Sequence, residues 1–237
     1  MPGREPPISF LISAEHASRH VPKPWQSLFA GHRSVLASHR GWDPGSGELA
    51  RALAAALDAP LLEGRFTRLL VDLNRSAGHP RHFSEFTRGL PAAEKRELVE
   101  RYWQPHWDCY RQYLESLPGQ IIHIACHSFS PEMDGKTRRT DIGLLYDPSR
   151  PLEAQFCRTL GAALRSRLPE LAVHMNQPYR GVSNGMGQQH RRDYDDSRLI
   201  TLELEINQRL IGLANWTACR KPIAEAIAEA VAETRPT

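Results

Sequence analysis

The sequence predicts an α/β protein. Segments with strand-like patterns alternate with segments rich in helix formers along the 237 residues, as they do in α/β folds. The run from 120 to 127 is almost continuously apolar, which is typical of a strand buried on both faces. The length fits one large domain or two small ones. Because neither a repeat nor a low-complexity linker divides the chain, we expect a single domain over residues 1–237.

The N-terminal part of the chain predicts three strands and one helix. The apolar run 8–13 is the first strand. Gly45-Ser46-Gly47 then introduces a helix over 48–57, where alanine and leucine, which are strong helix formers, predominate. The short segments 60–62 and 68–73 predict two further strands.

A long helix is expected between 91 and about 117. Pro91 suits the first turn of a helix, and the Pro118-Gly119 pair provides a stop signal. Pro105 lies inside this stretch and cannot donate a backbone hydrogen bond. We therefore expect a kink or a break there.

The C-terminal half alternates strands and helices more regularly. Its expected strands are 120–127, 141–146, an edge strand at 172–176, and 199–206; its expected helices are 151–168 and the alanine-rich 224–233. Two long polar segments, 74–88 and 179–198, are expected to be loops. Loops of that length are usually functional or disordered.

Composition argues against several classes of protein. The formal net charge is +3 and the basic residues are scattered, which disfavours a nucleic-acid partner. No apolar stretch is long enough to span a bilayer, and the first seven residues lack the apolar core of a signal peptide. We expect a cytoplasmic protein without a membrane partner. The four cysteines are widely spaced, which predicts free thiols. Nothing in the sequence indicates the oligomeric state.

Polar side chains follow four of the apolar runs at their carboxyl ends. They are Glu15-His16, Asp72 to Arg75, His127-Ser128 and Glu203 to Asn207. In an open α/β sheet the carboxyl ends of the strands form the crevice where ligands bind. Burying such groups is costly unless they pair or bind a metal, so the sequence predicts one shared polar site.

His16 and His127 are candidate metal ligands. Two histidines and a carboxylate, with one open position, are the usual protein contribution to a catalytic zinc site. The third ligand is Asp43, in a turn-rich segment before a helix, or alternatively Glu15. Adjacent strand residues point to opposite faces, which disfavours Glu15 beside His16. Both histidines could instead be loop residues with backbone partners.

Glu203 and Glu205 share one face of their strand because they are two residues apart. One can pair with an arginine while the other serves as general base for a metal-activated water. Glu205, nearer the strand end, is the candidate base. The alternative is an edge strand with a solvated acidic face. Asn74 and Arg75 open a polar loop, and Arg75 suits recognition of a carboxylate or an oxyanion, unless both are ordinary turn residues.

The ordered set of these motifs resembles the N-formylglutamate amidohydrolase family. The matching segments span most of the chain; they are Ser13 to Pro22, Trp42 to Gly45, Thr67 to Arg75, Ala125 to Ser128, Thr140 to Gly143, Tyr179 to Gly181 and Leu204 to Asn207.

The resemblance implies a three-layer α/β/α fold with a central mixed, largely parallel sheet, like that of zinc carboxypeptidases and the aspartoacylase group. It implies hydrolysis of the amide bond of an N-acyl amino acid, with a divalent metal, expected to be zinc, and a small substrate that carries a carboxylate. The implied roles are metal ligation by His16, Asp43 and His127, base catalysis by Glu205, and substrate contact by Asn74, Arg75, Arg180, Arg68 and Ser128.

Two residues depart from the related patterns: the first argues against transferring the carboxypeptidase ligand set directly, and the second indicates a divergent branch. The carboxypeptidase motif has a glutamate three residues after its first histidine, where this chain has Arg19. Glu15 stands where the histidine-degrading members of the family tend to have proline. Two other functions stay open: a metallohydrolase of another small amide or peptide, and a catalytically silent small-molecule binding protein on the same fold.

Overall fold

The computed structural model describes residues 7–212 and 216–234. Its centre is a six-stranded sheet in the order β2-β1-β3-β8-β6-β7. Four strands run parallel to one another: β2 (Leu61–Glu63), β1 (Ile8–Ala14), β3 (Gln120–Phe129) and β8 (Leu199–Asn207). β6 (Ile142–Leu145) is antiparallel to β8, and the edge strand β7 (Val173–Met175) is parallel to β6. The sheet is therefore mixed and largely parallel, as predicted.

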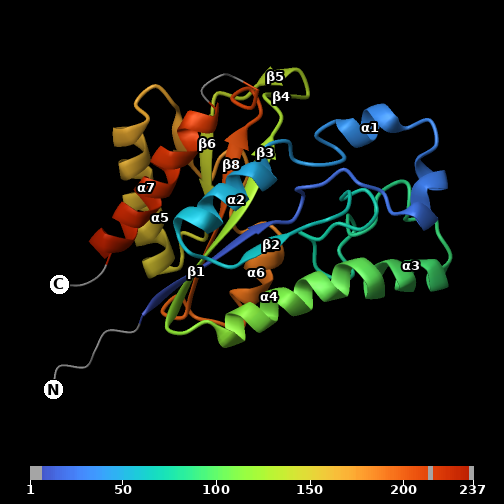
Figure 1. The fold of residues 1–237 in the computed structure, drawn as a ribbon, viewed down its shortest axis with the longest axis horizontal. Coiled ribbons are helices and arrows are strands. Elements are labelled where there is room, and N and C mark those ends of the chain that lie inside the picture. Colours follow the sequence, from blue (N-terminus) through green and yellow to red (C-terminus); the bar gives the residue numbers. More distant parts are fainter. Residues whose placement is uncertain (1–6, 213–215, 235–237) are drawn as a thin grey trace.

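Helices cover both faces of this sheet (Figure 1). One face packs against α2 (Ser46–Ala56), α5 (Pro151–Arg167) and α7 (Trp216–Thr234). The other packs against α4 (Gln104–Ser116) and the short α6 (Met186–His190). This arrangement confirms the three-layer α/β/α fold.

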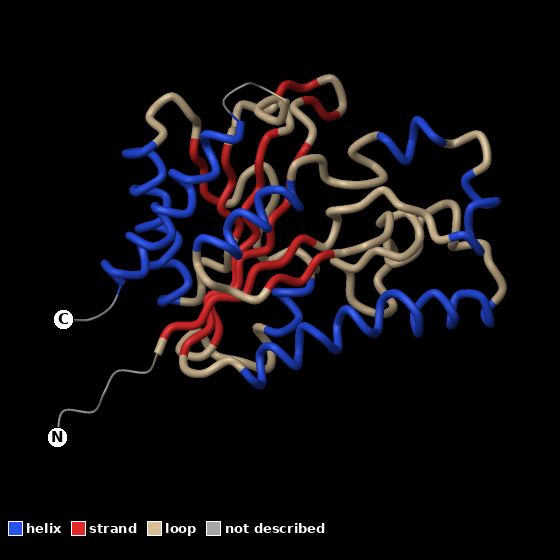
Figure 2. The backbone as a smooth tube through the Cα atoms, viewed as in Figure 1, coloured by secondary structure: helices blue, strands red, loops and turns tan. Residues whose placement is uncertain are grey.

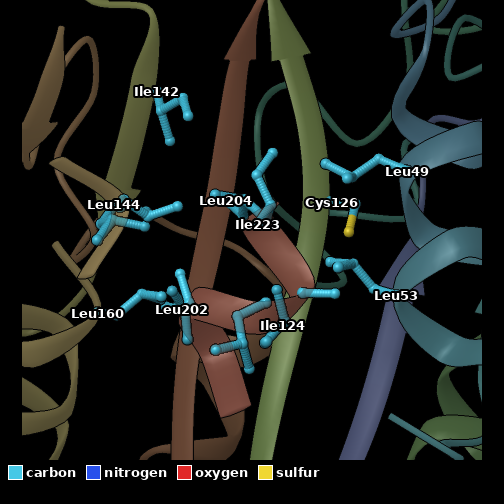
Figure 3. Close-up of a cluster of buried hydrophobic side chains, with 14 of the residues drawn as sticks. Leu49, Leu53, Ile124, Cys126, Ile142, Leu144, Leu160, Leu202, Leu204 and Ile223 are labelled. Carbon is cyan, nitrogen blue, oxygen red and sulfur yellow. The ribbon is translucent and has the colours of Figure 1, made fainter. Parts of the chain in front are cut away.

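The alternation of side chains along the strands assigns residues to the two cores. In β1, β3, β6 and β8 the even-numbered residues lie on the α2, α5 and α7 side, and in β1, β3 and β8 odd-numbered residues such as Leu11, Ile121 and Leu199 lie on the α4 side, because successive side chains of a strand point to opposite faces. Figure 3 shows part of the first core, including Leu49 and Leu53 of α2, Leu160 of α5, Ile124, Cys126, Leu144, Leu202 and Leu204. The four cysteines are free, as predicted.

Residues 68–73 do not form the predicted strand. They form successive turns, and the amide of Leu70 donates to the carbonyl of Thr67 at 3.0 Å. Their apolar side chains are nevertheless buried, because Leu69 and Leu70 enter one small core while Val71 and Leu73 enter another. Burial on two sides without a neighbouring strand therefore produces a strand-like sequence pattern.

Two indole groups of the helix that packs beneath this turn segment bind it through hydrogen bonds. Nε1 of Trp107 donates to the carbonyl of Leu73 at 2.9 Å, and Nε1 of Trp103 donates to the carbonyl of Arg75 at 2.9 Å. The two rings stack with centroids 4.6 Å apart. They supply the donors that a neighbouring strand would have provided.

The predicted long helix is continuous along the green ribbon of Figure 1. It consists of α3 (Ala92–Leu98), a π-helical turn (Val99–Trp103) and α4. The π-helical turn directly precedes Pro105, which lacks an amide donor. The predicted disturbance at Pro105 is thus a widened turn that does not end the helix.

Several short elements lie in segments for which the sequence predicts none. They are a 3₁₀ helix (Lys23–Phe29), α1 (Arg33–Ala37), the hairpin β4 (Glu132–Met133) with β5 (Lys136–Thr137), and α6 inside the expected loop 179–198. α7 begins at Trp216 rather than at 224 and contains Pro222. Figure 2 shows the loops gathered beyond the ends of β1 and β2.

Within the described ranges, no helix combines the length and the hydropathy that crossing a bilayer requires. The first six residues, which were part of the segment assessed for a signal peptide, lie outside the described residues.

Candidate active site

A cavity of about 450 Å³ lies where β1, β3 and β8 end. His16 follows β1, His127 belongs to β3 and Glu205 to β8, while Asp43 precedes α2. Parallel strands bring these ends to one edge of the sheet, as the sequence predicts. The cavity also carries many cationic side chains, namely Arg40, Arg68, Arg75, Arg81, Arg138 and Arg180.

His16, Asp43 and His127 form a buried cluster in this cavity. One potential donor atom of each lies within 4.8 Å of those of the others. Oδ2 of Asp43 is 3.4 Å from Nδ1 of His16 and 3.0 Å from Nδ1 of His127. Nδ1 of His16 is buried and has no hydrogen-bond partner among the described residues. Two imidazoles and a carboxylate, one with an unpartnered buried nitrogen, fit a divalent metal ion.

Each imidazole of the cluster turns its other nitrogen to a buried carboxylate. Nε2 of His16 lies 2.7 Å from Oδ1 of Asp72, and Nε2 of His127 lies 2.9 Å from Oε2 of Glu15. Such contacts orient the histidines of metal sites. β1 ends at Ala14, so strand alternation no longer separates Glu15 from His16. Glu15 nevertheless contacts the ring nitrogen of His127 that does not face Asp43.

Arg68 joins the two aspartates of this site. Its guanidinium lies 3.4 Å from Oδ1 of Asp43 and 3.0 Å from Oδ2 of Asp72. Burial disfavours the charged form of Asp72, but Arg68 and His16 hold its pKa well below the ordinary range. The imidazoles of His16 and His127, together with Arg68, likewise hold the pKa of Asp43 far below its ordinary value despite burial. Both carboxylates are therefore ionised and can bind a cation.

The imidazole of His127 favours its protonated form when no cation is bound. Burial disfavours the imidazolium form, but contacts with Asp43 and Glu15 raise the pKa of His127 well above its ordinary value. A metal ion must displace the proton on the nitrogen that faces Asp43, so binding of a metal at this cluster releases protons.

The two glutamates of β8 differ in their partners. Oε1 of Glu203 accepts a hydrogen bond from Nδ2 of Asn74 at 2.9 Å, whereas Oε2 of Glu205 is buried and unpartnered within the described residues. Burial, together with repulsion from Asp43 and Glu203, raises the pKa of Glu205 to about 8. Glu205 can therefore exchange a proton near neutral pH.

The edge-strand alternative for Glu203 and Glu205 is wrong. β8 lies between β3 and β6, and Glu205 is 5% exposed. At its register partner Gly143, a Cβ would lie 3.3 Å from the Cβ of Glu205 and 2.1 Å from the carbonyl oxygen of Gln177. The chain therefore passes close to Glu205 only because residue 143 has no side chain.

Asn74 and Arg75 link the loops around the cavity. The side-chain oxygen of Asn74 accepts from the amide of Met186 at 2.8 Å, and its nitrogen donates to Glu203, so both polar groups are occupied. Nη1 of Arg75 donates to the carbonyls of Asn74 and Asn184. Nε of Arg75 is buried and has no partner in the described part of the chain. Arg75 thus lines the cavity with one donor unpartnered, while Asn74 joins its loop to β8.

The remaining predicted substrate contacts lie on the cavity wall. Arg180 is exposed at the rim. The hydroxyl of Ser128 donates to the carbonyl of Pro44 at 2.7 Å and so braces the turn that carries Asp43. The sequence prediction of site residues omits Arg40 and Arg81, whose segments contain no specific motif.

Asp72 belongs to a recognised motif, but the sequence does not reveal its contact with His16. The two residues are 56 positions apart, and only the folded chain brings them together. The buried imidazoles and carboxylates, with arginines around them, at the strand ends of a three-layer α/β/α fold define the protein as a hydrolytic enzyme of the α/β class.

Comparison with known proteins identifies the family within this class. The sequence pattern of the N-formylglutamate amidohydrolases matches residues 8–212, and the chain belongs to this family. It is an amidohydrolase. Among curated proteins, no relative matches significantly.

Two solved structures are similar over nearly their whole length. A gene product of Agrobacterium tumefaciens is 26% identical, with a TM-score of 0.76, and the match covers 95% of this chain and 91% of that chain. The N-formylglutamate amidohydrolase of Ralstonia eutropha JMP134 is 16% identical, with a TM-score of 0.70, covering 99% and 96%. At that identity the second likeness supports the fold alone.

Proposed function

We propose that this protein hydrolyses the amide bond of an N-acyl amino acid, with a small formyl-like acyl group, in a metal-dependent reaction. The observation that carries the proposal is the meeting of His16, Asp43 and His127 in a cavity that also holds the unpartnered carboxyl of Glu205. Zinc is the preferred ion, because two imidazoles and one carboxylate are typical zinc ligands. A divalent ion bound there would lower the pKa of water and polarise a carbonyl oxygen.

Glu205 serves as the general base and then as the general acid. Its carboxylate takes the proton of the attacking water, and the resulting acid returns that proton to the leaving amine nitrogen. Without a cation the pKa of Glu205 is about 8 because of burial. A nearby cation favours the ionised form, which prepares the carboxylate to accept the proton.

Arginines at the cavity select a substrate that carries a carboxylate. Arg75 lines the cavity and can donate from its guanidinium to the substrate carbonyl or to the developing oxyanion. Arg180, at the exposed rim, can pair with the carboxylate of the amino acid. Arg68 supports the site by keeping Asp43 and Asp72 ionised. Asn74 and Ser128 stabilise the cavity wall through their hydrogen bonds.

The test begins with the metal content and the substrate range of the purified protein. N-formyl-L-glutamate, N-formyl-L-leucine, N-acetyl-L-glutamate and a dipeptide are assayed before chelation, after chelation, and after zinc or manganese is restored. We expect chelation to abolish hydrolysis and zinc to restore it, with formyl substrates preferred. Full activity without metal would overturn the metal dependence, and preference for the dipeptide would indicate a peptidase.

Variants test the assigned roles. Glu205→Gln should lower turnover by about 10²–10⁴-fold with unchanged zinc content, and His16→Ala should lose zinc. The exposed His20 provides a matched control, because His20→Ala removes an imidazole outside the cavity and should retain both zinc and activity. Full turnover by Glu205→Gln would exclude it as the base.

A further inference from the structure

A row of buried polar side chains runs from His127 into the protein interior. It consists of Glu15, Ser13, His123 and the hydroxyls of Tyr110 and Thr201, none more than 2% exposed. The strand residues of the row lie on the α4 side of the sheet, as the odd-numbered positions of β1, β3 and β8 do. Buried polar groups cost stability unless they are hydrogen-bonded, so each member of the row requires a partner.

The hydrogen bonds of the row have one consistent direction. Oγ of Ser13 lies 2.5 Å from Oε1 of Glu15 and 2.8 Å from Nε2 of His123. Since an ionised carboxylate only accepts hydrogen bonds, the single hydroxyl proton of Ser13 is donated to Glu15. The serine oxygen must then accept from His123, which places the proton of that ring on Nε2.

The far end of the row completes this pattern. Nδ1 of His123 lies 2.9 Å from the hydroxyl of Tyr110 and 2.8 Å from that of Thr201. Burial lowers the pKa of His123 to about 3, so the ring is neutral and Nδ1 accepts a hydrogen bond from one of these hydroxyls. From that hydroxyl through His123 and Ser13, each donor therefore points toward Glu15.

The near end of the row meets the candidate metal cluster. Oε2 of Glu15 and Nε2 of His127 are 2.9 Å apart, and neither atom has a hydrogen-bond partner elsewhere among residues 7–212 and 216–234. Each is thus the available partner of the other. This pairing keeps a proton on Nε2 of His127 and leaves Nδ1, 3.0 Å from Asp43, as the nitrogen for an ion.

We propose that Glu15 is a positioning residue that fixes the orientation and tautomer of His127, and that Ser13 and His123 hold Glu15 in place for this task. The proposal assigns a role to three interior side chains, Glu15, Ser13 and His123, that the hydrolytic mechanism does not use. It also gives Glu15 a function other than direct ligation. The inference rests on the proposed function only for the identity of what His127 binds.

The test compares three variants of the full chain. Glu15→Gln keeps the shape but places an amide where the row supplies only donors, and Ser13→Ala removes the hydroxyl that joins Glu15 to His123. Glu153→Gln is the matched control: Glu153 is also fully buried, pairs with Arg191, and contacts only the backbone amide of Thr201 in the row. Zinc affinity is measured by competition with a chelator, and the imidazole resonances by ¹H–¹⁵N NMR of the metal-free protein.

We expect Glu15→Gln to weaken zinc binding by about 10–100-fold, Ser13→Ala to weaken it less, and Glu153→Gln to leave it within about twofold. The Nε2 proton signal of His127 should shift or exchange faster in the first two variants and stay unchanged in the control. If Glu15→Gln does not fold, Ser13→Ala decides.

Wild-type zinc affinity and unchanged His127 resonances in both variants would overturn the proposal. So would X-ray absorption showing that Glu15→Gln loses an oxygen ligand, since Glu15 would then be a ligand itself. If the wild-type protein binds no zinc, the proposed function fails, while the imidazole spectra still decide whether Glu15 positions His127.

Discussion

Replacing Glu205 by glutamine should make the metal-free protein less sensitive to rising pH. The native state keeps a proton on this carboxyl up to a pKa of about 8, compared with an ordinary value of 4.5. Between these values the unfolded chain has released the proton and the native protein has not. Stability therefore falls as the pH rises, and the glutamine variant lacks this contribution.

The magnitude follows from the interval between the two pKa values. Each pH unit corresponds to about 1.4 kcal/mol, so the interval from 4.5 to about 8 gives about 5 kcal/mol at most. The free energy of unfolding of Glu205→Gln, minus that of the wild type, should grow from pH 5 to pH 8 and be constant above it. Other titrating groups are common to both proteins and largely cancel.

Urea unfolding of both proteins, with a chelator present, measures this difference at unit steps from pH 5 to 9. Tryptophan fluorescence and circular dichroism should give the same midpoints, as two-state unfolding requires. A difference that does not change with pH would refute the reasoning, because it would show that Glu205 titrates alike in the native and unfolded states.

Four further substitutions have definite expected outcomes. Arg180→Ala should raise KM for an N-formyl amino acid about tenfold, as loss of a hydrogen bond to a charged group implies, with little change in kcat in steady-state kinetics. Leu144→Ala, in the fully buried core, should lower the free energy of unfolding by about 2–5 kcal/mol, whereas Leu152→Ala, 40% exposed, should change it by less than about 0.5 kcal/mol. Trp107→Phe leaves the carbonyl of Leu73 without its donor and should cost about 1–3 kcal/mol in urea unfolding.

The sequence was sufficient to predict which strands carry the site residues and that the carboxyl ends of these strands lie together. An apolar run followed by histidine or glutamate identifies the carboxyl end of a parallel strand, and parallel strands share one edge. His16, His127 and Glu205 could therefore be grouped without coordinates. Asp43 joins this group as the carboxylate of a turn-rich segment before a helix, since Glu15 is adjacent to His16.

Other parts of the fold and the site depend on packing that the sequence pattern does not encode. The segment 68–73 has the composition of a strand, but two small cores bury it instead of a sheet. The contact of Glu15 with His127 depends on side-chain rotation after the end of β1, and alternation rules apply only within a strand. Asp72 was visible as part of a motif, yet its pairing with His16 is a long-range contact.

The indole donors of Trp103 and Trp107 tie Arg75 to the long helix. His127 and Glu205, which line the same cavity, belong to the sheet instead. Arg75 stays in place only while the π-helical turn and α4 stay folded beneath it. Mild heating that opens this helix would displace Arg75 although His127 and Glu205 still sit in an intact sheet. Thermal inactivation should therefore precede global unfolding, and backbone amides of 68–75 should exchange with deuterium earlier than those of β3.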